Sequence, residues 1–86
     1  MTRYQTRRAI GTAIRENRVT VGLTQDALAK RVKLTRAYIS QVEQGAVGLL
    51  ADRLFAIAHA MDMSVVMICR RAERRWLDAR KQEVGK

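Results

Sequence analysis

The sequence predicts a single all-α domain, and three observations support this prediction. The chain of 86 residues contains no proline and only five glycines, so it has few of the turn residues that a β-sandwich needs. Apolar residues make up 48% of it, which is too many for a disordered chain. Several segments place these residues at helical spacing. The length suits one domain, and a core this small favours a dimer in which two chains share apolar surface.

The first helix is predicted over Thr6–Val19. Ile10, Ala13 and Ile14 fall on one stripe of this helix, while its arginines lie mostly on the other faces. Gly22 is expected to end the helix in the left-handed conformation, which glycine adopts without steric strain.

Two short helices with a very short connection are predicted next. Thr24 is expected to cap the first of them, which runs to Val32. Thr35 is expected to cap the second, which runs to Gln44, and Gly45 then stops it. Two short helices around a tight turn, the second rich in polar residues, indicate a helix-turn-helix.

A fourth helix is predicted over Leu50–Met61, where Leu50, Leu54 and Ile57 belong to one apolar stripe. The loop before it, Ala46–Leu50, carries no charge. Such a loop offers nothing to a phosphate, and it is compatible with an apolar contact to another protein.

The next segment, Ser64–Cys69, is predicted to be a short β-strand. It is apolar and rich in β-branched residues, although periodicity alone does not separate a strand from a helix here. A lone strand leaves its backbone groups unpaired, and the sequence shows no second strand. We therefore expect it to pair with its copy in a second subunit, through a dimer interface made of Val65, Val66, Met67 and Ile68. The basic segment Arg70–Lys86 is expected to be a weak helix or a tail.

The chain is strongly basic. Its 17 Lys and Arg against 8 Asp and Glu give a net charge of +9. Residues 1–49 contribute +6 (nine minus three) and residues 50–86 contribute +3 (eight minus five), so both halves are basic. Nucleic acid, or an acidic membrane or protein surface, is the expected partner. Arginine outnumbers lysine, and its planar fork suits phosphates and guanine edges.

The composition also excludes several classes of protein. The single cysteine, Cys69, rules out a disulfide framework and a multi-cysteine zinc site, and the single histidine, His59, leaves no histidine pair for a metal. No orienting motif surrounds a nucleophile, so we expect no enzyme activity, no metal and no cofactor. No apolar run approaches the ~20 residues that span a bilayer, and no signal peptide is evident. We expect a cytoplasmic, nucleoid-associated protein without a membrane partner.

The helix that follows Thr35 has two contrasting faces. Ile39 and Val42 lie on one face and are expected to be buried. The opposite face carries polar or small residues within an arc of about 140°, namely Arg36, Ala37, Ser40, Gln41 and Gln44. Arginine pairs with guanine, glutamine pairs with adenine, and a small residue tolerates a thymine methyl group. This face therefore suits the reading of base edges, whereas an ordinary solvated face carries more Glu and Lys.

The spacing of the apolar residues is more specific still. Within Gln25–Gln44 they occupy the fourth, eighth, tenth, fifteenth and eighteenth positions, as Leu28, Val32, Leu34, Ile39 and Val42. The small Ala29 stands fifth, where two helices must approach closely. This pattern and its surroundings, over residues 7–63, resemble the helix-turn-helix of the Cro/C1-type (XRE) family of DNA-binding regulators. The resemblance implies a lambda-repressor-like fold.

The resemblance also implies roles for individual residues. It implies that the base contacts are made by Thr35, Arg36, Ala37, Ser40 and Gln41. Gln25, at the start of the second helix, is implied as a phosphate contact, where helix N–H groups would assist it. Arg18 and Glu43 are implied as a salt bridge between helices.

Other basic and aromatic residues around this motif are candidates for phosphate contacts. Lys33 stands where the family usually has glycine, and a left-handed conformation there would cost on the order of 1 kcal/mol. A phosphate contact by its ammonium group would offset part of that cost. Tyr38 is expected at the rim with its hydroxyl near a phosphate. Arg8 and Arg53 are further candidates on geometry alone.

A finer resemblance covers Leu54–Met67, which is similar to the end of HipB-type antitoxins, where a helix runs into a strand that pairs across the dimer. It implies an antitoxin that represses its own operon and binds a HipA-like Ser/Thr kinase toxin. A stand-alone or phage-type regulator without a toxin fits residues 7–63 equally well. Trp76, among the arginines of the basic segment, either docks on its own dimer or anchors a partner.

The sequence thus predicts three segments: a helix-turn-helix domain over residues 1–63, a dimerising strand over 64–69 and a basic helix or tail over 70–86. The predicted function is sequence-specific repression by a homodimer on a palindromic operator of double-stranded DNA, with a HipA-like toxin as a second partner.

Overall fold

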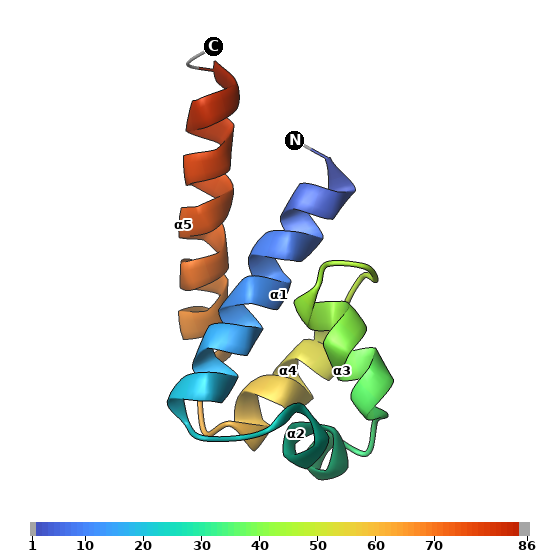
Figure 1. Ribbon diagram of the computed structural model, residues 1–86. Coiled ribbons are helices and arrows are strands. Elements are labelled where there is room, and N and C mark those ends of the chain that lie inside the picture. The colour runs from blue at the N-terminus through green and yellow to red at the C-terminus, as the bar shows by residue number, and fades with distance from the viewer. Residues whose placement is uncertain (1, 85–86) are drawn as a thin grey trace.

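The computed structural model describes residues 2–84, and within that range the chain forms five α-helices and no strand (Figure 1). The all-α prediction is confirmed. In chain order the helices are α1 (Arg3–Thr20), α2 (Gln25–Val32), α3 (Arg36–Glu43), α4 (Ala51–Ala60) and α5 (Val65–Val84). The outermost positions of the two predicted end segments, residues 1, 85 and 86, lie outside this range. No helix within residues 2–84 is both long and apolar enough to cross a membrane.

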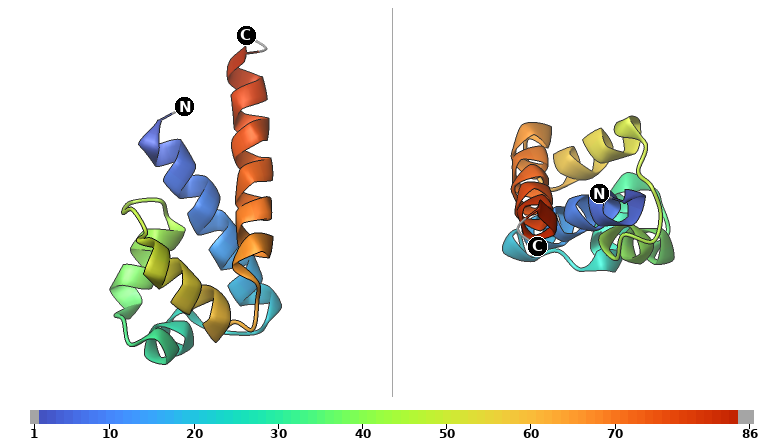
Figure 2. Two further views of the ribbon diagram at one scale, coloured as in Figure 1. Left: turned by 180° about the vertical axis from the view of Figure 1, so that it is seen from behind. Right: turned by 90° about the horizontal axis from the view of Figure 1, so that it is seen from above.

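Helix α1 is the centre of the arrangement. It lies between α5 on one side and the α2–α3 pair on the other, with α4 behind it in the view of Figure 1 (Figures 1 and 2). The upper part of α5 projects beyond the other helices, so the described chain is elongated, with extents of 43 × 21 × 21 Å.

Each helix contributes one large aliphatic side chain to a shared core. Ile14, Leu28, Ile39, Ile57 and Ile68 come from α1 to α5 in turn, and none is more than 1% exposed. Full burial of such a side chain stabilises the fold by about 1.5–3 kcal/mol. Because the five side chains meet in one cluster, the position of each helix depends on the other four.

The first four helices all end in a left-handed residue. Gly22 (φ +78°) and Gly45 (φ +74°) follow α1 and α3, as predicted, and Lys33 (φ +57°) and Asp62 (φ +53°) follow α2 and α4. A left-handed residue turns the chain away and lets backbone N–H groups satisfy the last carbonyls of the helix. The predicted N-caps of α2 and α3 are also confirmed, since the Thr24 hydroxyl accepts a hydrogen bond from the Ala27 N–H. These left-handed residues and N-caps keep α2 and α3 short and fix the angle between the two helices.

The predicted strand over residues 64–69 is wrong, because residues 65–69 form the first turns of α5. Ser64 starts the helix: its hydroxyl accepts from the Val66 N–H at 3.2 Å and its carbonyl from the Met67 N–H at 3.1 Å. The β-branched run favours a strand by only a fraction of a kcal/mol per residue, and burial overrides that preference.

The side chains that hold α5 in place recur at helical spacing across the boundary of the predicted segments. Ile68 and Ala72 are buried, and Trp76 is half-buried against the same core. The Trp76 Nε1–H donates a hydrogen bond to the Thr6 hydroxyl of α1 at 3.1 Å. The basic segment is therefore a docked helix, and its single tryptophan packs on its own chain.

Gly11 sets how closely α1 and α3 approach. A Cβ atom at this position would collide with the Val42 carbonyl oxygen and would lie 2.8 Å from that of Glu43. Only a residue without a side chain allows the backbone of α3 to rest on α1 at this depth. The sequence analysis did not single out Gly11, although an isolated glycine inside a helical pattern is a recognised sign of close packing.

We expect Gly11→Ala to lower the free energy of unfolding by about 3 kcal/mol, because the colliding atoms belong to rigid backbone. Gly22→Ala is the matched control, since a Cβ there meets nothing within 4 Å and only the positive φ is strained. That control should lose about 1 kcal/mol. Urea unfolding followed by circular dichroism measures both values, and equal losses would contradict a close contact at Gly11.

Candidate nucleic-acid interface

The connection between α2 and α3 is tight because Lys33 adopts the left-handed conformation. The Lys33 N–H bonds to the Lys30 carbonyl at 3.3 Å, and the Leu34 N–H bonds to the Ala29 carbonyl at 2.9 Å. Thr35 then caps α3 by accepting from the Tyr38 N–H at 3.0 Å. The predicted helix–turn–helix geometry is confirmed, and Lys33 keeps the turn in spite of its side chain.

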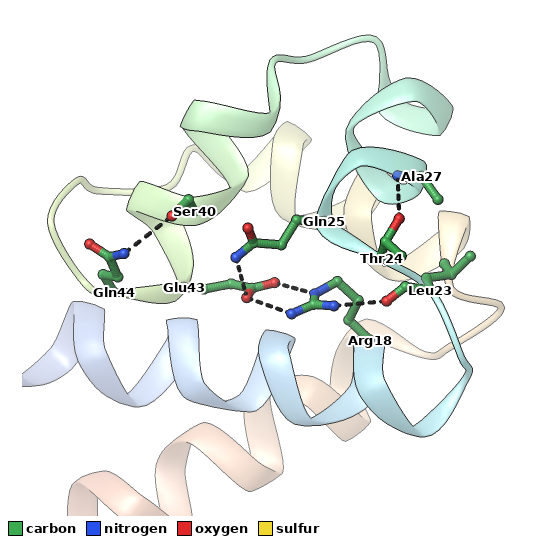
Figure 3. A network of polar contacts seen from close by, with 8 residues as sticks. All are labelled: Arg18, Leu23, Thr24, Gln25, Ala27, Ser40, Glu43 and Gln44. Atoms are coloured by element: carbon green, nitrogen blue, oxygen red, sulfur yellow. Dashed lines mark hydrogen bonds and ion pairs between the residues drawn. The ribbon is translucent and has the colours of Figure 1, made fainter.

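Helix α3 has the two faces that the sequence predicts. Ile39 and Val42 are at most 2% exposed and pack into the core. The opposite face is open to solvent, with Thr35, Arg36, Ala37 and Gln41 exposed and Ser40 half-buried among them. The five residues predicted to contact bases therefore lie together on one surface. The Gln44 amide donates to the Ser40 hydroxyl at 3.2 Å, which orders the end of this surface (Figure 3).

A buried ion pair fixes α3 against α1 (Figure 3). The Arg18 guanidinium donates to both Glu43 carboxylate oxygens, through Nε at 2.7 Å and Nη2 at 3.0 Å. Its third nitrogen, Nη1, donates to the Leu23 carbonyl at 2.8 Å, just before α2. Arg18 is 9% exposed and Glu43 is 5% exposed. The salt bridge implied by the resemblance is confirmed, and its bidentate geometry is the strong form of such a contact.

Gln25 belongs to the same network. Its Nε2 donates to the Glu43 Oε1 atom at 3.1 Å, so the side chain joins the start of α2 to the end of α3 (Figure 3). The phosphate contact predicted for Gln25 therefore has to be made by the second hydrogen of its Nε2 group or by its backbone N–H. In the structure, the Gln25 side chain holds the start of α2 at a fixed distance from the end of α3.

Tyr38 lies on the flank of α3, half-buried against α4. The Arg53 guanidinium of α4 stacks over its ring, with 4.9 Å between the guanidinium carbon and the ring centroid. Hydrogen bonding and charge interaction with the Tyr38 side chain raise the pKa of Arg53 above its ordinary value. Arg53, like any arginine, is positively charged at physiological pH, and it lies beside α3. Lys33 is exposed in the turn that precedes α3.

The uncharged loop before α4 packs mostly on its own chain. Val47 and Leu49 are half-buried against the core, whereas Leu50 is 62% exposed. Its glycine, Gly48, lies against the Arg7 guanidinium of α1. The apolar character of this loop is therefore largely explained by contacts inside the domain.

The residues predicted for a dimer interface are divided by the helical conformation of α5. Ile68 is buried in the core and Val65 is half-buried. Val66 and Met67 are 59% and 47% exposed. Neither residue lines the open apolar groove of about 330 Å³ between α1, α4 and α5, whose apolar wall includes Ile10, Leu54, Ile68, Ala72 and Trp76. Phe55, next in sequence to a wall residue, is 55% exposed.

Comparison with known proteins gives a consistent result. A family model described as "Helix-turn-helix" matches residues 14–68. The structure is similar to the clp gene regulator ClgR from Corynebacterium glutamicum, at 27% identity and a TM-score of 0.83, covering 93% of this chain and 86% of that one. The restriction-modification controller protein C.AhdI from Aeromonas hydrophila is 28% identical, with a TM-score of 0.75 and coverage of 79% and 99%.

A third similar structure is the restriction-modification controller protein C.Esp1396I, a tetramer in complex with its natural 35 base-pair operator. It is 26% identical, with a TM-score of 0.75, and the match covers 84% of this chain and 95% of that one. Among curated proteins, none matches the sequence.

The ion pair between Arg18 and Glu43 can be tested by removing one charge. Glu43→Gln leaves the guanidinium buried without a counter-charge, and we expect the free energy of unfolding to fall by about 3–5 kcal/mol. Glu16→Gln is the matched control, because the Glu16–Arg75 ion pair is partly exposed and should contribute at most about 1 kcal/mol. The comparison uses urea unfolding of both variants, and a small loss for Glu43→Gln would refute the importance of the pair.

Proposed function

Because this chain belongs to the Cro/C1-type helix-turn-helix family and is a DNA-binding transcriptional regulator, we propose that it is a repressor that reads its operator with α3. The observation that supports this proposal is the composition of the exposed face of α3. Arg36 and Gln41 project next to the small Ala37, while the opposite face is fully buried. In the major groove, arginine and glutamine would pair with guanine and adenine edges.

The surroundings of α3 suit a phosphate backbone on both sides of the groove. Lys33 supplies one charge at the turn, and Arg53 supplies another on α4, where stacking on Tyr38 orients its guanidinium. Such contacts set the position of a protein on the duplex and carry no sequence information. Base reading by α3 and anchoring by its neighbours are therefore separate contributions to affinity.

The repressor acts as a homodimer in this proposal, so that two α3 helices read two halves of a pseudo-palindromic operator about one helical turn, or a multiple, apart. The dimer surface in this proposal is the apolar groove between α1, α4 and α5, extended by two exposed side chains. Phe55 follows the wall residue Leu54, and Val66 lies three residues before the wall residue Cys69 on α5. Two features support this choice: large apolar side chains are exposed there, and the helical conformation of residues 65–69 leaves no strand edge to pair.

Of the two roles that the sequence predicts, we put the stand-alone regulator first. The antitoxin role is argued from a strand over residues 64–69, and those residues begin a helix. C.AhdI, of which the match covers 99%, is a controller protein of similar extent. Affinity purification of the tagged protein after nuclease treatment tests this choice. Recovery of a kinase-sized protein at fixed stoichiometry would instead support a HipA-like toxin partner.

We expect Arg36→Ala and Gln41→Ala each to weaken operator binding by about 1–3 kcal/mol and to relax the preference at one base pair. The operator is first obtained by selection from a pool of random duplexes, and fluorescence anisotropy then gives the affinities. The matched controls, Arg15→Ala on α1 and Gln82→Ala on α5, change the same residue types away from α3 and should leave the affinity unchanged. If both α3 variants lose equal affinity for operator and random DNA, α3 does not read bases.

The dimer surface is tested with Val66→Lys. A lysine there costs the monomer little, since Val66 is 59% exposed, but it would bury a charge between two subunits. We expect sedimentation equilibrium to show monomers and operator affinity to fall at least tenfold. Val19→Lys is the matched control, because Val19 is 61% exposed at the end of α1 and does not belong to the proposed dimer surface. A Val66→Lys variant that stays dimeric would exclude this surface.

A further inference from the structure

A second basic surface lies on α5. Its cations share one side of the helix, which we call the arginine face: Arg70, Arg71, Arg74, Arg75 and Lys81. All five side chains are exposed. Arg75 is paired with Glu16 of α1, and two acids of α5, Glu73 and Asp78, lie among these residues. Among the described residues, Arg70, Arg71 and Arg74 have no ion-pair partner.

The arrangement of charges on this face is unfavourable for the isolated helix. Arg70 and Arg74, like Arg71 and Arg75, are separated by four residues and therefore lie one above the other on the helix surface. Like charges at this spacing destabilise a helix by about 0.2–0.5 kcal/mol per pair. An anion bound along the face would turn this repulsion into attraction.

The arginine face points away from the operator-reading surface. Helix α5 lies on the side of α1 opposite α3, and both the front view and the view from above show this (Figures 1 and 2). The arginine face is also on the other side of α5 from the apolar groove, whose wall includes Cys69, Ala72 and Trp76. A DNA duplex held by α3 would not reach this face, and a dimer formed through the groove would not cover it.

The chemistry of the face fits a phosphate backbone better than a protein surface. Arginine forks bind phosphate bidentately. From Arg70 to Lys81 the face extends for about 16 Å, and a duplex presents one negative charge per ~1.7 Å of its axis. Interfaces between proteins depend on buried aromatic or aliphatic anchors, and the large apolar side chains beside the arginine face, Met67 and Leu77, are outnumbered by its cations. The bound chain is therefore expected to be nucleic acid, held without regard to its sequence.

We propose that the arginine face binds the backbone of a second nucleic-acid duplex, so that the protein bridges its operator to another DNA segment. The bridging of two duplexes rests on the proposed function of α3, because α3 would hold the operator. The binding of a duplex by α5 does not depend on it. In this arrangement the affinity for the second duplex is electrostatic. Its logarithm should fall with the logarithm of salt concentration with a slope of about −3 if three unpaired arginines each neutralise one phosphate.

The test uses the full chain on an immobilised operator duplex, to which a labelled duplex of unrelated sequence is added. We expect the complex to retain the labelled duplex at low salt and to release it as salt rises. The triple variant Arg70→Gln, Arg71→Gln and Arg74→Gln should lose at least tenfold in retention, while its affinity for a short operator stays within twofold. The triple variant with lysine at the same positions keeps the charge and should retain most of the binding.

Three results would overturn the proposal: no retention by the unmodified protein, equal retention by the glutamine variant, or a parallel loss of operator affinity in that variant. The last would place the face on the operator itself. Retention of poly-glutamate in place of the duplex would identify an acidic protein partner and likewise refute it. If no operator is found, the proposed function fails separately, and the salt slope of both variants on random duplex still decides whether α5 binds DNA.

Discussion

The geometry of the helix-turn-helix depends on the buried contact between Arg18 and Glu43. One guanidinium bonds both carboxylate oxygens of Glu43 and the carbonyl that precedes α2, and Gln25 donates a third hydrogen bond to the same carboxylate. Three helices are thereby held by one group of charges. A buried pair of this kind adds little net stability compared with apolar packing. Removing one partner is nevertheless strongly destabilising, because it leaves the other charge buried without a partner. Its contribution is to permit one arrangement of α1, α2 and α3 and to penalise the others.

A second constraint acts from the backbone side of the same contact. Gly11 lets α3 rest directly on α1, and Gly45 lets the chain leave α3 beside the backbone of Arg8. Helix α3 is therefore located by backbone contact, by an ion pair and by two buried apolar side chains. With one face so fixed, the exposed residues of the other are presented rigidly, which lowers the entropy that binding a DNA groove would otherwise lose.

Sequence patterns were sufficient for the helix-turn-helix and insufficient for the segment after it. Capping by Thr24 and Thr35, and the burial of Ile39 and Val42, follow from local chemistry that is complete within a few residues. The conformation of residues 64–69 is decided by contacts with α1, which are distant in sequence. Ile68, Ala72 and Trp76 recur at helical spacing, and this repeat crosses the boundary between the predicted strand over 64–69 and the basic segment over 70–86.

The candidate site shows the same division. Which residues of α3 face solvent was predictable from helical periodicity, because one face had to be buried. Two other contacts were not predictable from periodicity, because each depends on the final distance between two helices. They are the hydrogen bond from the Gln25 amide to Glu43 and the stacking of Arg53 on Tyr38. The depth of the α1–α3 contact likewise depends on a residue, Gly11, that has no side chain to form a pattern.

The position of Trp76 has an optical consequence. It is the single tryptophan of the chain, and it is packed between the α1 hydroxyl that it bonds and the Arg80 guanidinium 5.9 Å from its ring. Its emission therefore senses the docking of α5 on α1 and is insensitive to α2 and α3, which lie on the far side of α1. Ellipticity reports all five helices at once. Recorded together during a temperature scan, the two signals distinguish detachment of α5 from melting of the remaining domain, without a label or an added chromophore.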